Sequence, residues 1–187
     1  MALHSTPASM LKESLHEILE ASKYCIEYKK DDPEKWKELT SNGCLGYPGA
    51  ILLFSIVDSI GSYYRQNKSF TIEVDGKSKF ISSDGWQHFL ILNSKYFNQN
   101  LSEKFIKVLY AKFRSCLTHN SVLGKDARME PENSNGMAFY EGLNEKKEFR
   151  YIISMKEFWI LCEMAIKEFN NDIDAIVPNS KQGKNFH

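Results

Sequence analysis

The pattern of apolar and polar residues predicts helices along most of the chain. Apolar side chains recur at helical spacing in five long stretches, which cover residues 9–30, 48–67, 84–96, 102–118 and 154–173. A shorter helix is predicted over 34–39, after Asp32 and Pro33. The stretch that begins at Pro48 is apolar around most of its circumference, so we expect it to be the central, buried helix.

Two segments change from helical to alternating spacing. Alternation in 70–74 precedes Asp75-Gly76, a strong tight-turn signal, and a second alternation runs through 137–141 and 148–153. Each pattern predicts a short β hairpin. The polar residues from Asn120 to Gly136, which precede the second hairpin, are predicted to form an irregular flap.

The size and composition are those of one globular domain. The chain has 187 residues, of which 42% are hydrophobic and 26% are charged. We expect a single helical domain over residues 1–175 and a polar tail over 176–187. The predicted class is all-α, an up-and-down helical bundle with two small inserted β hairpins.

The stretch from Leu101 to Gly124 carries the strongest functional signal. Ser102 is placed to cap its helix, and an apolar stripe of four residues predicts that one face is buried: Ile106, Leu109, Phe113 and Leu117. Arg114 and His119 follow near its end, so a fixed cation and a group that titrates near neutrality lie five residues apart.

An unbroken α-helix does not aim these two side chains at one small ligand. At 100° per residue, Arg114 lies about 100° to one side of the stripe and His119 about 120° to the other. Three arrangements would resolve this: the helix ends near Thr118 with Asn120 as a left-handed cap, the arginine side chain sweeps back, or a second subunit supplies the missing half.

The sequence Arg-Ser-Cys-Leu-Thr-His after a long amphipathic helix resembles the R-x4-6-H motif of the HEPN superfamily, whose members are helical and often metal-independent ribonucleases. The resemblance implies a homodimer with Arg114 and His119 as catalytic residues and with substrate-binding roles for three polar neighbours, Ser115, Thr118 and Asn120. It also associates the chain with toxin or antiviral defence systems and with an antitoxin or regulatory protein as a partner. Ser115 departs from the Asn, Asp or His that often follows the family's arginine.

The chemistry of an arginine and a histidine suits RNA cleavage. Arg114 would hold the scissile phosphate, and His119 would move a proton to or from the attacking 2′-hydroxyl or the leaving 5′-oxygen. The alternative is a HEPN-like module without nuclease activity that binds a nucleotide, a nucleic acid or a protein partner. A small-molecule enzyme lacks support because no G-x-G-x-x-G, P-loop or G-x-S-x-G motif is present.

Charge changes the RNA hypothesis only locally. Lys plus Arg and Asp plus Glu both number 24, so RNA binding requires a local basic patch. The motif helix offers one, since it carries four cations against Glu103 alone: Lys104, Lys107, Lys112 and Arg114. The other interpretation of these lysines is a solvated helix face.

Cysteine usage and apolar runs predict an intracellular protein without cofactors. The four cysteines are scattered without ligand spacing, which favours buried reduced thiols over a zinc site or disulfides: Cys25, Cys44, Cys116 and Cys162. The first ten residues lack a signal-peptide pattern, and the longest apolar run is interrupted by Ser55 and Asp58. We therefore expect no metal, no membrane span and a cytoplasmic location.

Two polar residues in apolar surroundings need partners. Asp58 lies within the most apolar helix, and we expect it to be hydrogen-bonded at a helix boundary rather than functional. His88 lies on or beside the apolar side of the 84–96 helix and is interpreted as a satisfied core residue. The nearby cluster Tyr63-Tyr64-Arg65 either stacks on a base or forms a helix rim.

Overall fold

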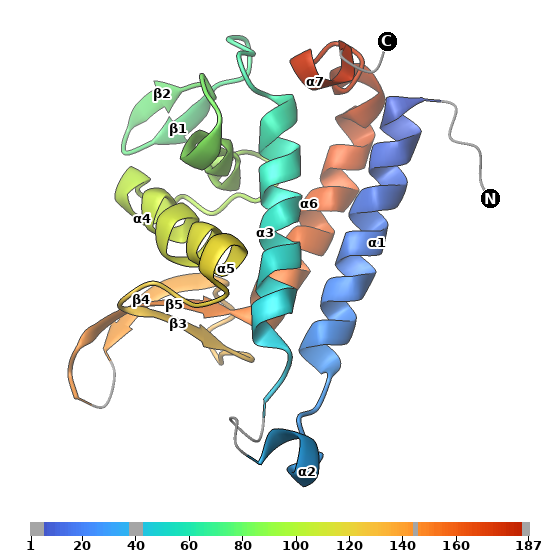
Figure 1. Ribbon diagram of the computed structural model, residues 1–187. Coiled ribbons are helices and arrows are strands. Elements are labelled where there is room, and N and C mark those ends of the chain that lie inside the picture. The colour runs from blue at the N-terminus through green and yellow to red at the C-terminus, as the bar shows by residue number, and fades with distance from the viewer. Residues whose placement is uncertain (1–5, 38–42, 144–145, 185–187) are drawn as a thin grey trace.

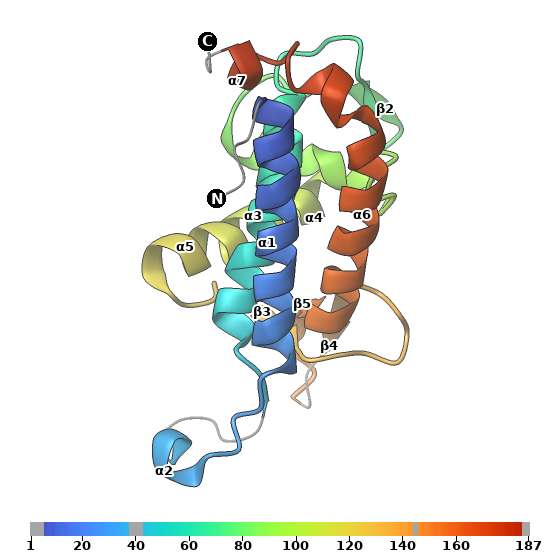
Figure 2. The same ribbon diagram turned by 90° about the vertical axis from the view of Figure 1, so that its right-hand side faces the viewer.

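Three long helices form the body of the molecule. The computed structural model describes residues 6–37, 43–143 and 146–184. Helices α1 (Pro7–Glu27), α3 (Gly46–Tyr63) and α6 (Met155–Ile176) lie side by side, and α1 runs opposite to the other two (Figures 1 and 2). The predicted central helix is confirmed, because α3 packs on both α1 and α6 and buries eight of its residues.

The motif helix and its neighbours cover the other side of α3. The 3₁₀ helix η1 (Gly85–Asn93) packs on α3 and is followed by α4 (Glu103–Val108), the π-helical turn η2 (Leu109–Ser115) and α5 (Cys116–Asn120). In Figure 1 these elements lie on the opposite side of α3 from α1. The Phe54 ring, on α3, lies 5.6, 6.4 and 5.0 Å from the rings of Phe89, Phe113 and Phe158, so one buried aromatic cluster joins α3 to η1, η2 and α6.

Both predicted hairpins are confirmed. Strands β1 (Ile72–Val74) and β2 (Lys77–Lys79) pair antiparallel around Asp75 and Gly76, whose φ angles of 52° and 69° fit a tight hairpin turn. Strands β4 (Phe139–Leu143) and β5 (Phe149–Ser154) also pair antiparallel.

The all-α prediction is wrong, because a third strand turns the second hairpin into a sheet. Strand β3 (Ala127–Glu130) pairs parallel with β5, which gives a three-stranded mixed sheet in the order β3-β5-β4. The described fold is therefore an α and β mixture, about 56% helical with two sheets. Strand β3 lies in the segment that was expected to be an irregular flap; it has only four residues, and its partner lies more than twenty residues later in the sequence, which local alternation does not reveal.

Several element ends also differ from the predictions. The helix expected over 84–96 is a 3₁₀ helix that ends at Asn93, and Asp84 occupies its N-cap position without a side-chain cap bond. Helix α2 (Pro33–Trp36) follows the predicted Asp32 cap, although part of the expected span, 38–39, lies outside the described residues. In the predicted polar tail, α7 (Lys181–Lys184) follows the buried Ser180.

No helix among the described residues has both the length and the apolar character that crossing a bilayer requires.

Candidate functional site

The motif helix begins as predicted and then widens. Ser102 Oγ accepts a hydrogen bond of 3.2 Å from the Phe105 amide, which confirms the cap. All four residues of the predicted stripe are fully buried: Ile106, Leu109, Phe113 and Leu117. The helix is not a single α-helix, however, because η2 winds through one π-helical turn that contains Arg114.

Contacts from outside the helix support the wide turn. The carbonyl oxygen of Lys112 accepts a 2.7 Å hydrogen bond from the amide of Gly124, beyond the end of α5. A Cβ atom at Gly124 would lie 2.9 Å from Cα and Cβ of Lys112, so only glycine allows this approach. Ser121, rather than the predicted Asn120, takes the left-handed conformation that ends α5, with φ of 56°.

Arg114 is held by a carboxylate from the central helix. Its Nη2 donates a 2.7 Å hydrogen bond to Oδ2 of Asp58, and its guanidinium carbon lies 5.5 Å from the centre of the Tyr110 ring. The side chain of Arg114 remains 27% exposed, and its Nε and Nη1 have no hydrogen-bond partner among the described residues. The arginine is thus fixed at one nitrogen and accessible to solvent elsewhere.

Asp58 has a second partner, His88. The Nδ1 atom of His88 lies 2.7 Å from Oδ1 of Asp58, and because an ionised carboxylate only accepts, Nδ1 carries the proton of this bond. Burial raises the pKa of Asp58, but the His88 hydrogen bond and the charge of Arg114 outweigh burial, so the pKa lies below its ordinary value. Asp58 is therefore a carboxylate that two neighbours keep ionised.

The polar cluster continues from His88 to the end of α3. Oδ1 of Asp84 lies 3.4 Å from Nε2 of His88 and also pairs with Arg65. Gly61 makes this packing possible, since a Cβ atom there would lie 2.2 Å from the carbonyl oxygen of His88. Basic and acidic side chains thus alternate across α3, η1 and η2.

The remaining predicted site residues lie around Arg114 but do not contact it through a hydrogen bond. Ser115 is half-buried, whereas Thr118, His119 and Asn120 are exposed on α5. Within the described part of the chain, no hydrogen bond or ion pair engages the side chain of His119. The helix does end shortly after Thr118, although Ser121 is its left-handed residue, and the Arg114 side chain extends to Asp58 on α3 rather than toward His119.

Asp58 and His88 were not among the predicted site residues, yet both belong to the cluster around Arg114. Asp58 is hydrogen-bonded, as expected, but it lies inside α3 rather than at its boundary, and its partners are His88 and the motif arginine. His88 is satisfied only at Nδ1, because its buried Nε2 has no hydrogen-bond partner among the described residues. The signal was present in the sequence, because an ionisable side chain in the most apolar helix requires a polar partner.

Two searches beyond the Arg114 cluster, for grouped metal-binding side chains and for similar proteins, gave no match. The described residues contain no group of three or more His, Cys, Asp or Glu side chains arranged to hold a metal ion. No protein-family model matches the chain, and neither the curated proteins nor the solved structures contain a significant match.

Proposed function

We propose that the protein is an endoribonuclease of HEPN type, in which Arg114 binds the scissile phosphate and His119 transfers a proton. One observation carries the proposal. Asp58 fixes the guanidinium of Arg114 by a 2.7 Å bond and leaves two of its nitrogens without a protein partner, next to the exposed end of α5 that bears His119. A pre-oriented arginine loses less side-chain entropy when it binds a phosphate than a mobile one does.

Asp58 and His88 act as positioning residues in this proposal. The His88 bond holds the Asp58 carboxylate, and Asp58 in turn orients Arg114, while neither Asp58 nor His88 is expected to touch RNA. Asp58 also cancels part of the arginine charge, so the phosphate must bind mainly through the directed N–H groups of Nε and Nη1.

The reaction follows from these groups. The substrate's own 2′-hydroxyl attacks the adjacent phosphorus, His119 assists by moving a proton, and Arg114 stabilises the charge on the phosphate oxygens. The P–O5′ bond breaks and leaves a 2′,3′-cyclic phosphate and a 5′-hydroxyl. DNA lacks the 2′-oxygen and is not a substrate. Proton transfer of this kind contributes about 10²- to 10⁴-fold to a rate.

The proposed site is shared between two subunits. Arg114 lies in the π-helical turn and bonds to Asp58 on α3, whereas His119 lies five positions later, exposed on α5 and without a hydrogen bond to Arg114. The histidine of one copy would therefore complete the arginine site of the other in a homodimer.

Cleavage of end-labelled single-stranded RNA by the pure full-length protein tests the proposal. We expect activity in EDTA, cyclic phosphate ends by mass analysis, and a loss of at least 100-fold in both Arg114→Ala and His119→Ala. His16→Ala is the matched control, because His16 is also an exposed histidine, on α1. Cleavage that survives His119→Ala, or that proceeds on DNA, contradicts the mechanism.

A mixture of the two inactive variants tests the shared site. In a heterodimer of Arg114→Ala and His119→Ala chains, one of two shared sites has both wild-type residues, so activity returns on mixing. If both residues came from the same chain, every site in the mixture would lack one of them and activity would not return. A sedimentation measurement on the same samples establishes whether dimers form.

A second candidate function is RNA or protein binding without cleavage. The pairing of Arg114 with Asp58 and the presence of Ser115 after the arginine favour it, since both change the environment of the motif. Under this alternative, RNA or an antitoxin-like regulatory protein binds the same surface and no new RNA ends appear. Retarded mobility of intact RNA that Arg114→Ala abolishes would distinguish binding from cleavage.

A further inference from the structure

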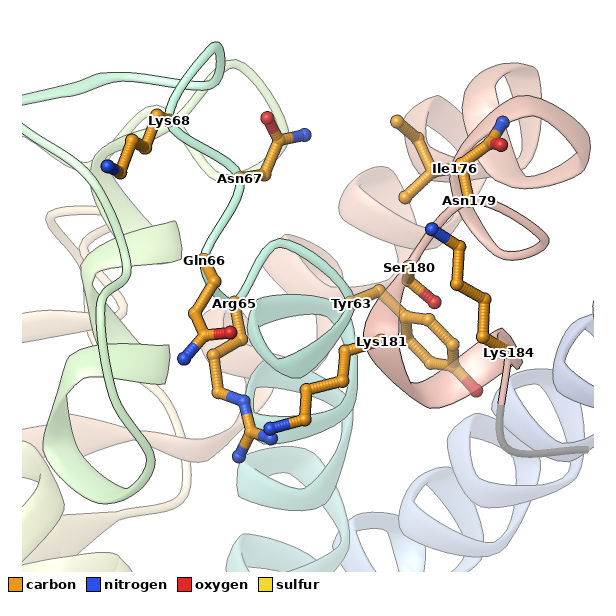
Figure 3. Close-up of a pocket in the computed structure, with 10 residues that line it drawn as sticks. All are labelled: Tyr63, Arg65, Gln66, Asn67, Lys68, Ile176, Asn179, Ser180, Lys181 and Lys184. Atoms are coloured by element: carbon orange, nitrogen blue, oxygen red, sulfur yellow. The ribbon is translucent and has the colours of Figure 1, made fainter.

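A basic cavity lies near the C-terminal end of α3, apart from the Arg114 and His119 surface. It has a volume of about 530 Å³, within the range of small-molecule sites. The end of α3 and the loop 65–68 form one wall, and the segment 176–184, which includes α7, forms the opposite wall (Figure 3). A ligand in this cavity would bind independently of the proposed RNA cleavage.

The charges that line the cavity have one sign. Among the described residues, its walls contain four cationic side chains and no carboxylate: Arg65, Lys68, Lys181 and Lys184. The three lysines have no ion pair among the described residues, and Arg65 pairs with Asp84, which lies outside the lining. With Asp84 counted, three positive charges remain uncompensated.

Two of the four cationic side chains approach one another, whereas in Figure 3 Lys184 points toward Asn179 and Lys68 points away from Arg65. Figure 3 shows Lys181 extending across the opening toward the guanidinium of Arg65, although like charges repel one another. In Figure 3 the side-chain amide of Gln66 lies beside Arg65. The backbone φ of Gln66 is 64°, a left-handed conformation that is unfavourable for a residue other than glycine. A bound anion would relieve the repulsion.

The size of the uncompensated charge indicates the kind of anion. A single phosphate monoester carries a charge of about −1.5 to −2 and would leave the cavity positive, whereas a chain of two or three phosphates matches it. The ring of Tyr63 and the amide of Asn179 add surface for a sugar or a base next to the phosphates.

We propose that this cavity binds the di- or triphosphate group of a nucleotide or of an RNA 5′ end, through Arg65, Lys181 and Lys184, with Lys68 at its rim. Both sources present the same chemistry to the lysines. A phosphate chain would bridge Arg65, beyond the end of α3, and the two lysines of α7, so binding also stabilises α7 against the body of the protein.

Calorimetric titration of the full-length protein with inorganic triphosphate tests the site. We expect triphosphate to bind at least tenfold more tightly than orthophosphate, and the affinity to fall as sodium chloride is added. The double variant Lys181→Gln/Lys184→Gln should bind triphosphate about ten- to a hundredfold more weakly, because it loses two charge-assisted contacts. Both lysines are exposed, so the variant is expected to fold, which a thermal unfolding curve verifies.

Lys29→Gln is the matched control, since Lys29 is an exposed lysine just beyond the opposite end of the bundle, after α1. Equal binding of triphosphate by the wild type and the double variant overturns the proposal, as does an absence of binding at millimolar triphosphate or an equal loss in Lys29→Gln. Parallel titrations with ATP, RNA bearing a 5′-triphosphate and RNA bearing a 5′-hydroxyl identify the source: the ligand whose affinity is highest and falls in the double variant is the occupant. Loss of RNA cleavage in His119→Ala leaves this result unchanged, so the two proposals fail separately.

Discussion

Replacing Gly61 with alanine places a methyl group where the backbone of η1 already lies. The added Cβ would be 2.2 Å from the carbonyl oxygen of His88 and 2.8 Å from its carbonyl carbon, whereas ordinary contact begins at 3.4 Å. Neither helix can absorb the overlap by turning a side chain, because the obstacle is main chain. Segment η1 must therefore retreat from α3 by about 1 Å, and His88 moves with it.

The expected loss of stability follows from three contributions. Overpacking of this kind costs about 1–3 kcal/mol, and loss of the buried bond between His88 and the Asp58 carboxylate costs about 1.5–3 kcal/mol. The higher helix propensity of alanine returns about 1 kcal/mol. The net destabilisation of Gly61→Ala is about 1.5–5 kcal/mol, which lowers Tm by about 3–20 °C for a domain of this size.

Urea and thermal unfolding of both the wild type and Gly61→Ala measure this effect. Gly46→Ala is the matched control, because Gly46 lies on the same helix and its nearest atom outside the helix, Met129 Cε, is 3.5 Å from the added Cβ. We expect Gly46→Ala to change the free energy of unfolding by less than about 0.5 kcal/mol. If Gly61→Ala is as stable as Gly46→Ala, the close contact between α3 and η1 does not hold His88, and the reasoning is refuted.

Three further predictions concern Asp58, Gly124 and the two motif residues. Asp58→Asn should destabilise the protein by about 1–3 kcal/mol at neutral pH. Because folding lowers the pKa of Asp58 from 3.8, the stability that its carboxylate contributes is present above pH 3.8 and is lost as the pH falls. The unfolding curves of the wild type and Asp58→Asn should therefore converge in acid. Gly124→Ala should cost about 1–3 kcal/mol through its overlap with Lys112, and hydrogen exchange should rise across 109–124 while that of β1 and β2 stays constant. His119→Ala should leave Tm within a degree or two because His119 is exposed, whereas Arg114→Ala should lower it by leaving Asp58 without its cation; equal values of Tm in differential scanning calorimetry would contradict this.

Local sequence signals placed the elements whose causes are local. The Ser102 cap, the Asp75-Gly76 turn and the four-residue stripe of the motif helix each depend on residues within one turn or one hairpin, and the structure confirms them. The central helix was also recognisable from local sequence, because its apolar side chains are distributed around most of its circumference.

Which polar groups meet depends on contacts between segments that are distant in the chain. Strand β3 pairs in parallel with β5, whose residues lie more than twenty positions later in the chain. The π-helical turn is hydrogen-bonded to the amide of Gly124, which lies beyond α5. Asp58 bonds to His88, which is 30 residues away in the chain, and to Arg114, which is 56 residues away. The basic cavity joins two segments that are more than a hundred residues apart. A hydrophobic pattern determines which face of a helix is buried. The free energy of a buried charge depends instead on the particular atoms around it, and tertiary packing brings those atoms together.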